Sequence, residues 1–203
     1  EGNTVIAVAQ AGQVLGIIAL ADELRTDAVT TVQALKARGI RVVMLTGDNE
    51  RAASVVARQV GVDEYLAGVL PEHKAEGVAK YRAQGDLVGM VGDGINDAPA
   101  LAAADVGFAI GAGSAVALDT ADVVLMKSEM TGVLDAISLS SATLSKIRQN
   151  LFFAFIYNIL GLPLAAFGML NPIVAGAAMA MSSVSVVSNS LLLNRWKPSG
   201  RQV

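Results

Sequence analysis

The sequence feature that most restricts the fold of this chain is an uncharged run of 44 residues, from Leu151 to Asn194. A helix needs about 20 apolar residues to cross a bilayer, so the run is long enough for two crossings. Asn171-Pro172 divides it, and we predict transmembrane helices over 151–170 and 173–193 with a short turn at 168–172. A buried hairpin of a soluble protein is the alternative, but helices that are apolar all round and flanked by basic residues argue against it.

Basic residues flank this run on both sides, and acidic residues are confined to the part of the chain before it. Lys146 and Arg148 precede the run, and Arg195, Lys197 and Arg201 follow it, with no acid after Asp135. Residues 1–135 contain all 18 acids and 10 of the 15 basic residues, a net charge of −8. The positive-inside rule then predicts an integral membrane protein whose soluble part and both chain ends are cytoplasmic.

The first 135 residues have the alternating pattern of an α/β domain with a parallel sheet. Short apolar runs rich in β-branched residues predict strands, and segments with helical spacing separate most of them. The segment 10–13 is expected to be the turn of a hairpin. We predict strands at 4–9, 14–20, 40–45, 66–70, 87–91, 106–110 and 123–126, and helices at 27–38, 52–56, 75–83, from about 98, and at 114–120.

Acidic and small residues follow two of the predicted parallel strands. The strand at 87–91 leads into Gly92-Asp93-Gly94-Ile95-Asn96-Asp97-Ala98-Pro99, and the strand at 40–45 leads into Thr46-Gly47-Asp48-Asn49. Open α/β sheets bind ligands beyond the carboxyl ends of their strands, and carboxylates there suit Mg²⁺. The alternative is that these residues only form turns, with Asp97 capping one helix and Asp48 or Asn49 capping another.

Lys74 lies at another predicted entry into a helix, within Pro71-Glu72-His73-Lys74. Its ammonium could reach a phosphate as a point charge, although a lone Lys at such a position is more often a solvated helix residue. His73, the single histidine, is expected at the surface. The absence of Cys excludes disulfides and thiolate metal sites from this chain.

Polar residues within the predicted membrane helices indicate a transport site, because such residues are costly in a bilayer. Tyr157 and Asn158 lie in the first helix, and Met179 and Ser183 lie four residues apart in the second. A thioether with neutral oxygens suits a soft monovalent ion such as Cu(I), whereas divalent ions favour a carboxylate or imidazole, which both helices lack. Serines also allow helices to pack closely, so a structural role is the alternative.

Together these motifs resemble the P-type cation-pumping ATPases, and within them the heavy-metal class that exports Cu(I). The resemblance covers almost the whole chain, as the carboxyl-terminal portion of such a pump. It depends on the order and spacing of five motifs, which are Thr46-Gly47-Asp48, Pro71-x-x-Lys74, Gly92-Asp93-Gly94-Ile95-Asn96-Asp97, Tyr157-Asn158 and Met179-x-x-Ser182-Ser183.

The resemblance implies a haloacid-dehalogenase-like phosphorylation domain, ATP as substrate and an aspartyl-phosphate intermediate. Asp93 would bind Mg²⁺, Asn96 and Asp97 would order the site, and Asp97 would lie behind the metal ligands. Lys74 would contact the transferred phosphoryl group. Thr46, Gly47 and Asp48 would hold that group from the other side, and Gly92 and Gly94 would line the cofactor site with Lys74. Tyr157, Asn158, Met179 and Ser183 would bind Cu(I), with Ag(I) as a related ion.

The resemblance also divides the chain and implies its partners. Residues 1–20 would end a nucleotide-binding domain, 21–135 form the phosphorylation domain, 136–150 a linking helix, 151–194 the last two transmembrane helices and 195–203 a cytoplasmic tail. The partners would be membrane lipid, the actuator and nucleotide-binding domains, the other transmembrane helices and a copper chaperone, with no nucleic acid. In a bacterium the membrane would be the plasma membrane.

Several motifs of the family are absent from these 203 residues, including the phosphorylated Asp-Lys-Thr-Gly-Thr, Thr-Gly-Glu and Cys-Pro-Cys. The chain starts without Met and runs directly into a strand pattern, so we expect a fragment that is inactive alone. Two other functions fit part of the sequence: a P-type pump for Zn or Cd, and a soluble Mg²⁺-dependent phosphatase of the same dehalogenase-like class. A non-enzymatic, membrane-anchored regulator is a third.

Overall fold

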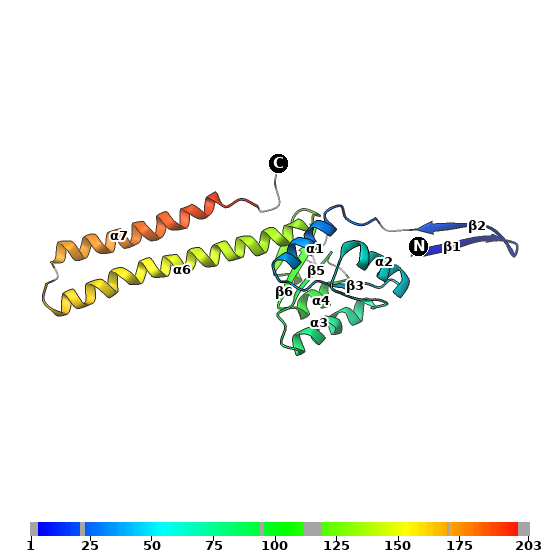
Figure 1. The fold of residues 1–203 in the computed structure, drawn as a ribbon, viewed down its shortest axis with the longest axis horizontal. Helices are drawn as coiled ribbons and strands as arrows, with labels where there is room; N and C mark the ends of the chain where they lie inside the picture. The colour runs from blue at the N-terminus through cyan, green and yellow to red at the C-terminus, as the bar shows by residue number, and fades with distance from the viewer. Residues whose placement is uncertain (1–3, 21–22, 94–95, 112–118, 170, 199–203) are drawn as a thin grey trace. The chain divides into compact units, whose positions relative to one another are not determined.

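The structure of the chain is a computed structural model that describes residues 4–20, 23–93, 96–111, 119–169 and 171–198 (Figure 1). The chain forms two compact units, Glu1–Leu134 and Asp135–Val203. The first unit combines strands and short helices, and the second is built from two long helices. The predicted helix at 114–120 lies mostly outside the described residues, as does Gly94.

A two-stranded antiparallel hairpin opens the chain, as predicted. Strand β1 (Thr4–Gln10) pairs with β2 (Gln13–Leu20), and the register includes Ala7 opposite Ile17. Ala11 and Gly12 form the turn with φ values of 49° and 82°. Positive φ at both central residues is typical of the type I′ turn, whose twist matches that of a hairpin.

Five short strands of the first unit pair in parallel, which confirms an α/β fold. Strand β3 (Val43–Leu45) pairs with β4 (Glu64–Leu66). Strands β5 (Gly89–Gly92), β6 (Val106–Ile110) and β7 (Val123–Leu125) form a second sheet in that order. Every parallel pair therefore presents the carboxyl ends of its strands at one edge.

Three predicted strands differ from the observed bounds by two residues or more, and in two of them local backbone geometry ends or delays the pairing. Gly39 adopts φ 76° after the preceding helix, and the N–H of Ile40 still donates to the carbonyl of Leu35, so β3 begins only at Val43 rather than at residue 40. Gly68, at φ 64°, interrupts the predicted strand 66–70, and the strand lies at 64–66 instead. Leu87 is 92% exposed and precedes β5.

Helices follow the strands at the predicted places. They are α1 (Ala28–Ala37), α2 (Glu50–Val60), the short 3₁₀ helix η1 (Pro71–His73), α3 (Lys74–Ala83) and α4 (Ala98–Ala103). The side chain of Asn49 accepts a hydrogen bond from the N–H of Ala52 at 3.0 Å, so Asn49 and not Asp48 caps α2.

Two apolar clusters hold these helices in the first unit. Val78 of α3, Met90 of β5 and Leu101 of α4 form one buried cluster with Ala100. Ala28 and Val32 of α1 form the other with Val60 of α2. Each cluster joins a helix that precedes the carboxyl edge to one that follows it, so packing sets the position of that edge.

The second unit contains α6 (Thr131–Ala166) and α7 (Pro172–Leu191), followed by the 3₁₀ helix η2 (Leu192–Arg195). Both helices are long and apolar enough to cross a membrane. The predicted linking segment and the first predicted span are one continuous helix, α6, although it ends at Ala166 rather than at residue 170. Asn171 caps α7 by accepting a hydrogen bond from the N–H of Ile173 at 2.8 Å.

Candidate functional site

Loops after β3 and β4 place Thr46, Gly47 and Asp48 at the carboxyl edge of that strand pair. The N–H of Thr46 donates to the carbonyl of Leu66 at 3.0 Å, and the N–H of Gly68 donates to the carbonyl of Asp48 at 2.8 Å. The Thr46 hydroxyl donates to Asp48 Oδ2 at 2.8 Å and accepts from the N–H of Asp48 at 3.1 Å. Backbone pairing with the neighbouring loop therefore fixes this hydroxyl and carboxylate.

Lys74 and Asp97 form an ion pair that joins the start of α3 to the turn before α4. Lys74 Nζ lies 2.7 Å from Asp97 Oδ1, and the two side chains are only 18% and 11% exposed. Asp97 occupies the N-cap position of α4 but makes no side-chain capping bond there. Its other oxygen, Oδ2, accepts a long hydrogen bond of 3.4 Å from the N–H of Asp93. Asp97 thus connects Lys74 to the residue that follows β5.

Gly92 is required by the close approach of the Asp97 side chain. A Cβ at residue 92 would lie 2.6 Å from the Cβ of Asp97 and 2.8 Å from its Oδ2. Real side chains do not approach this closely, so any larger residue would displace the carboxylate that holds Lys74. The contact supplies a physical reason for this glycine, which the sequence motif alone did not.

The other predicted residues lie nearby in the chain but are not joined to this cluster by side-chain bonds. Asp93 and Asn96 are exposed. Among the described residues, no hydrogen bond or ion pair connects Thr46 or Asp48 to Lys74, Asp93 or Asp97.

The donors at this edge fit Mg²⁺. Asp93 presents an exposed carboxylate directly after β5, while Asp97 is already engaged by Lys74. The described residues contain no group of three or more His, Asp or Glu side chains that could enclose a metal. Magnesium commonly takes one or two carboxylates and completes its shell with water and phosphate oxygens, so a single exposed carboxylate suits it.

Three further aspartates, which no sequence motif indicated, lie at the opposite, amino-terminal edge of the strands and link neighbouring strands there. Asp63, Asp105 and Asp122 each precede a strand and accept a hydrogen bond from a backbone N–H of the neighbouring strand or the residue before it. The donors are Val42, Val88 and Gly107, at 2.9, 2.9 and 2.8 Å. An Asp immediately before each short strand is the sequence signal that could have revealed them.

These bonds shift the acidity of two of the three aspartates. The hydrogen bond from Lys36, reinforced by the Val42 N–H, lowers the pKa of Asp63 below its usual value. The Val88 N–H likewise lowers the pKa of Asp105, which also pairs with Arg82 at 2.9 Å. The two aspartates stabilise strand pairing as anions and take no part in the edge that carries Lys74.

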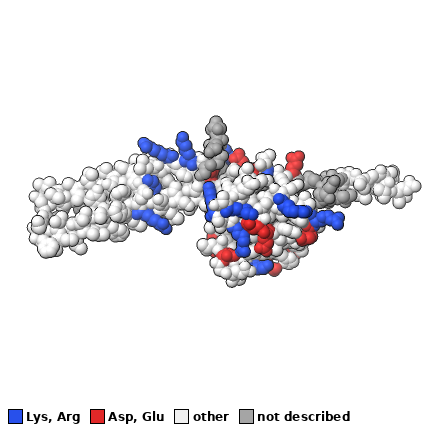
Figure 2. Space-filling model, viewed as in Figure 1, with Lys and Arg blue, Asp and Glu red and all other residues white. Residues whose placement is uncertain are grey.

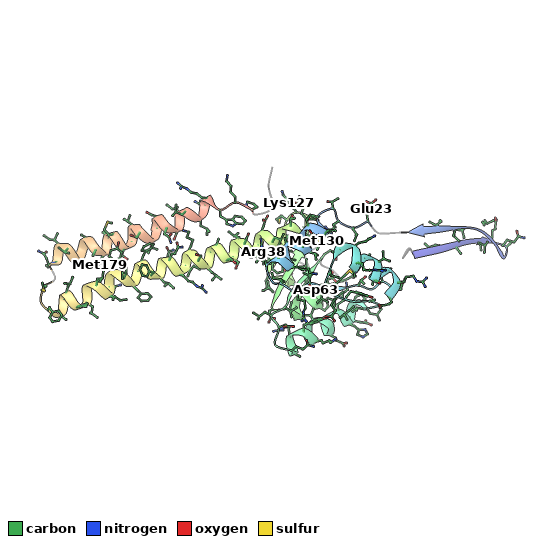
Figure 3. The ribbon with its side chains drawn as sticks, in the orientation of Figure 1. Glu23, Arg38, Asp63, Lys127, Met130 and Met179 are labelled. Atoms are coloured by element: carbon green, nitrogen blue, oxygen red, sulfur yellow. The ribbon has the colours of Figure 1, made fainter. Side chains whose placement is uncertain are left out.

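No described hydrogen bond joins the side chains of the four predicted membrane-site residues to one another. The Tyr157 hydroxyl lies 3.4 Å from the hydroxyl of Ser185, in the contact between α6 and α7. Asn158 and Ser183 instead bond to carbonyls of their own helices, those of Ala154 and Met179. Met179 is 72% exposed (Figure 3). Any common ligand of the four would need further helices to complete its shell.

A network of polar side chains, which the sequence did not reveal, lies at the other end of the contact between α6 and α7. Asn189 is 8% exposed, accepts a hydrogen bond from Lys146 Nζ at 2.9 Å and donates to Asn150 Oδ1 at 2.8 Å. Asn150 in turn donates to the hydroxyl of Ser190 at 2.8 Å. These side chains recur at helical spacing with Tyr157 and Ser185, so one face of each helix forms the contact.

The fold and this edge of the sheet define a class of protein. The family model of the haloacid dehalogenase-like hydrolases matches residues 1–105, and the chain belongs to that family. Its similarity to known proteins extends further, however, through the two apolar helices to nearly the whole chain.

The relatives confirm the resemblance to heavy-metal P-type ATPases. A protein of Enterococcus hirae named "Probable copper-importing P-type ATPase A" is 58% identical over 196 residues, which are 96% of this chain and 27% of that protein. "Probable copper-exporting P-type ATPase V" of Mycobacterium tuberculosis is 52% identical over 99% of this chain and 26% of its own length.

The structural similarity extends over the same length. The crystal structure of a zinc-transporting PIB-type ATPase in its E2.Pi state matches with a TM-score of 0.83 and 44% identity, over 95% of this chain and 32% of that one. The chain thus spans about a quarter of the length of the curated relatives that it matches.

Proposed function

We propose that this chain is part of an ATP-driven P-type pump that exports Cu(I), and also Ag(I), through an aspartyl-phosphate intermediate. The observation that carries the proposal is the partly buried Lys74–Asp97 pair, joined to the backbone of Asp93 at the carboxyl edge of the strands. The homologous P-type ATPases and the two apolar helices support its assignment to a membrane pump.

In the proposed reaction, the γ-phosphoryl group of ATP passes to an aspartate outside these 203 residues, and ADP leaves. Lys74 carries three N–H donors, of which Asp97 accepts one at 2.7 Å, so the others can donate to oxygens of the phosphoryl group. Asp97 holds the ammonium at one place before substrate arrives, which reduces the reorganisation needed in the transition state. The Thr46 hydroxyl, fixed by Asp48, would contact the group from the neighbouring edge.

Asp93 is the residue that would hold Mg²⁺, with Asn96 ordering the turn and Asp97 behind it. The metal would neutralise the charge that spreads over the phosphoryl oxygens. Gly92 keeps Asp97 within reach of Lys74, because no side chain intervenes.

Cu(I) is proposed as the cargo because the spans offer soft and neutral donors. Residues 151–194 contain no carboxylate and no imidazole, while Met179, Tyr157, Asn158 and Ser183 provide a thioether and oxygens. The names of the two relatives support copper but differ on the direction of transport, since one is called importing and the other exporting. A zinc pump is the second candidate, because the matched crystal structure is of a zinc transporter.

The proposed orientation places the first unit and both ends of the chain in the cytoplasm. No acidic residue follows Asp135, the first residue of the second unit, whereas Lys146, Arg148, Arg195 and Lys197 do follow it; on the face drawn in Figure 2, the red acidic side chains lie over the first unit. Basic residues next to a span favour the cytoplasmic side of a lipid membrane. The proposed partners are the remaining domains and helices of the same pump and a copper chaperone.

The test is ATP hydrolysis by the full-length parent protein in the presence of Cu(I), Ag(I) or Zn(II). We expect stimulation by Cu(I) and Ag(I), and stimulation by Zn(II) alone would refute the choice of ion. Asp93→Asn is expected to abolish phosphorylation from ATP while preserving the thermal unfolding temperature. Normal phosphoenzyme levels in this variant would remove Asp93 from the metal site.

A further inference from the structure

Helix α1 holds the first turn of α6 at both of its own ends. Asp27 lies at the N-cap position of α1, where an Asp usually bonds to its own helix, yet it makes no such bond. Its Oδ2 instead accepts a hydrogen bond from the N–H of Thr131, 104 residues away, at 3.0 Å. The carboxylate of one helix entry therefore caps another helix.

The opposite end of α1 makes the second bond. Arg38, at the C-cap of α1, donates from Nη1 to the carbonyl of Leu134 at 3.2 Å. Thr131 and Leu134 lie one helical turn apart, so the two bonds grip the same turn from its N–H side and its carbonyl side.

Apolar side chains at the start of α6 are buried between these two bonds. Met130 packs against the buried cluster of Ala28, Val32 and Val60, and Val133 and Leu134 are 4% and 6% exposed. Figure 3 labels Arg38 and Met130, which contact opposite parts of this region: Arg38 binds the carbonyl of Leu134, and Met130 packs on the cluster of α1 and α2.

The capping bond acts on backbone groups that α6 cannot satisfy by itself. The first four N–H groups of a helix have no partner within it, and a carboxylate there also interacts favourably with the helix dipole. Helix α6 has no acid of its own in its first turn. Asp27 therefore supplies from α1 the anionic cap that α6 lacks.

The contact between α1 and the first turn of α6, called the joint below, is continuous in sequence with two parts of the molecule. In one direction, α1 leads through Gly39 into β3 and then to Thr46 and Asp48 at the carboxyl edge. In the other, α6 continues without interruption from Thr131 to Ala166 and includes the uncharged run from Leu151. A movement of α1 would therefore act directly on the backbone of Thr131 and Leu134, at the start of the helix α6 that includes the apolar run.

We propose that Asp27 and Arg38 are positioning residues that couple phosphorylation at the carboxyl edge to movement of α6. The inference rests on the proposed pump function. It assigns the coupling to two side-chain bonds on α1, whose loss leaves Lys74, Asp93 and Asp97 in place.

The test compares metal transported per ATP hydrolysed by the full-length parent protein in sealed vesicles. Asp27→Ala should still form phosphoenzyme from ATP, but the transport ratio should fall at least about five-fold, as expected from losing a helix cap. Asp27→Asn should keep the ratio within about two-fold, because Asn caps as well as Asp. Arg38→Met should lower the ratio in the same direction as Asp27→Ala.

A matched control is Lys36→Met, which removes two other bonds in the last turn of α1, to Asp63 and to the carbonyl of Gly61. Lys36 pairs with Asp63 at 2.8 Å and touches no residue of α6 in the described contacts, so its ratio should stay unchanged. Equal loss in Asp27→Ala and Lys36→Met would overturn the proposal, as would equal loss in Asp27→Ala and Asp27→Asn. An unchanged ratio in both Asp27→Ala and Arg38→Met would also overturn it.

Amide hydrogen exchange of the 203-residue chain in detergent micelles separates this inference from the proposed function. Exchange at Thr131 should accelerate about five-fold in Asp27→Ala and much less in Asp27→Asn. If exchange accelerates but the transport ratio does not change, the joint exists and the coupling role is refuted. If the parent protein hydrolyses no ATP with any metal, the pump function fails, while the exchange result still reports on the joint.

Discussion

Replacing Lys74 by Met should destabilise the chain much more than removing an exposed lysine from a comparable ion pair. At the observed 2.7 Å and an effective dielectric constant of about 20, the attraction between Lys74 and Asp97 is about 6 kcal/mol before desolvation is subtracted. Removing one partner of a fully buried pair costs about 3–5 kcal/mol. Because the side chains are 18% and 11% exposed, we expect about 2–3 kcal/mol for this pair.

The measurement is thermal unfolding of the chain in detergent micelles, followed by circular dichroism. For a chain of this length, the expected loss corresponds to a fall in Tm of about 5–10 °C. Lys36→Met is the control, since its pair with Asp63 has a similar length of 2.8 Å but side chains that are 38% and 33% exposed. Its Tm should change only slightly. Equal shifts in the two variants would refute the argument that burial makes the Lys74–Asp97 pair important.

Three further predictions follow from particular contacts. Gly92→Ala should lower the free energy of unfolding by about 1–3 kcal/mol, because the new Cβ would displace Asp97. Gly47→Ala should be tolerated, because its new Cβ would meet only the carbonyl of Val69, at 3.6 Å, and equal Tm values for the two variants would contradict this difference. Stability should be lost as the pH falls below about 4, because folding lowers the pKa values of Asp63 and Asp105, and protonation therefore favours the unfolded chain. The double variant Asp63→Asn/Asp105→Asn should flatten the acid side of a Tm–pH curve, and an unchanged slope would count against this cause. Met179→Leu, nearly equal in volume, should lower the Cu(I) stoichiometry of the parent protein measured by elemental analysis, and an unchanged stoichiometry would exclude Met179 from the site.

The positions of the acids at the strand ends could be predicted because they depend on local pattern. A short apolar run followed by Gly and Asp places that Asp beyond a strand, and β3 and β5 end directly before Thr46 and Asp93. The bounds of β3 could not be predicted in the same way. Ile40 is apolar, but the left-handed Gly39 and the bond from Ile40 to Leu35 keep it at the end of α1.

Sequence spacing allows Asp97 to be either a helix cap or a site residue, and its spatial partner decides between the two roles. Asp97 occupies the cap position, but its side chain binds Lys74, 23 residues earlier in the chain. Asp27 shows the same behaviour, since it precedes α1 and caps α6 instead. A carboxylate can satisfy several N–H or ammonium donors, and sequence spacing identifies only those in its own segment.

The sequence by itself determined that the chain combines a parallel α/β domain with two helices long enough to span a bilayer. Hydrophobic period, run length and turn residues act within a few residues of each other, so they can be read along the chain. Only the tertiary structure decided which charged groups meet at the strand ends, why Gly92 has no side chain and which faces of α6 and α7 are in contact. These features arise from pairs of residues far apart in sequence, whose geometry depends on how the intervening elements pack.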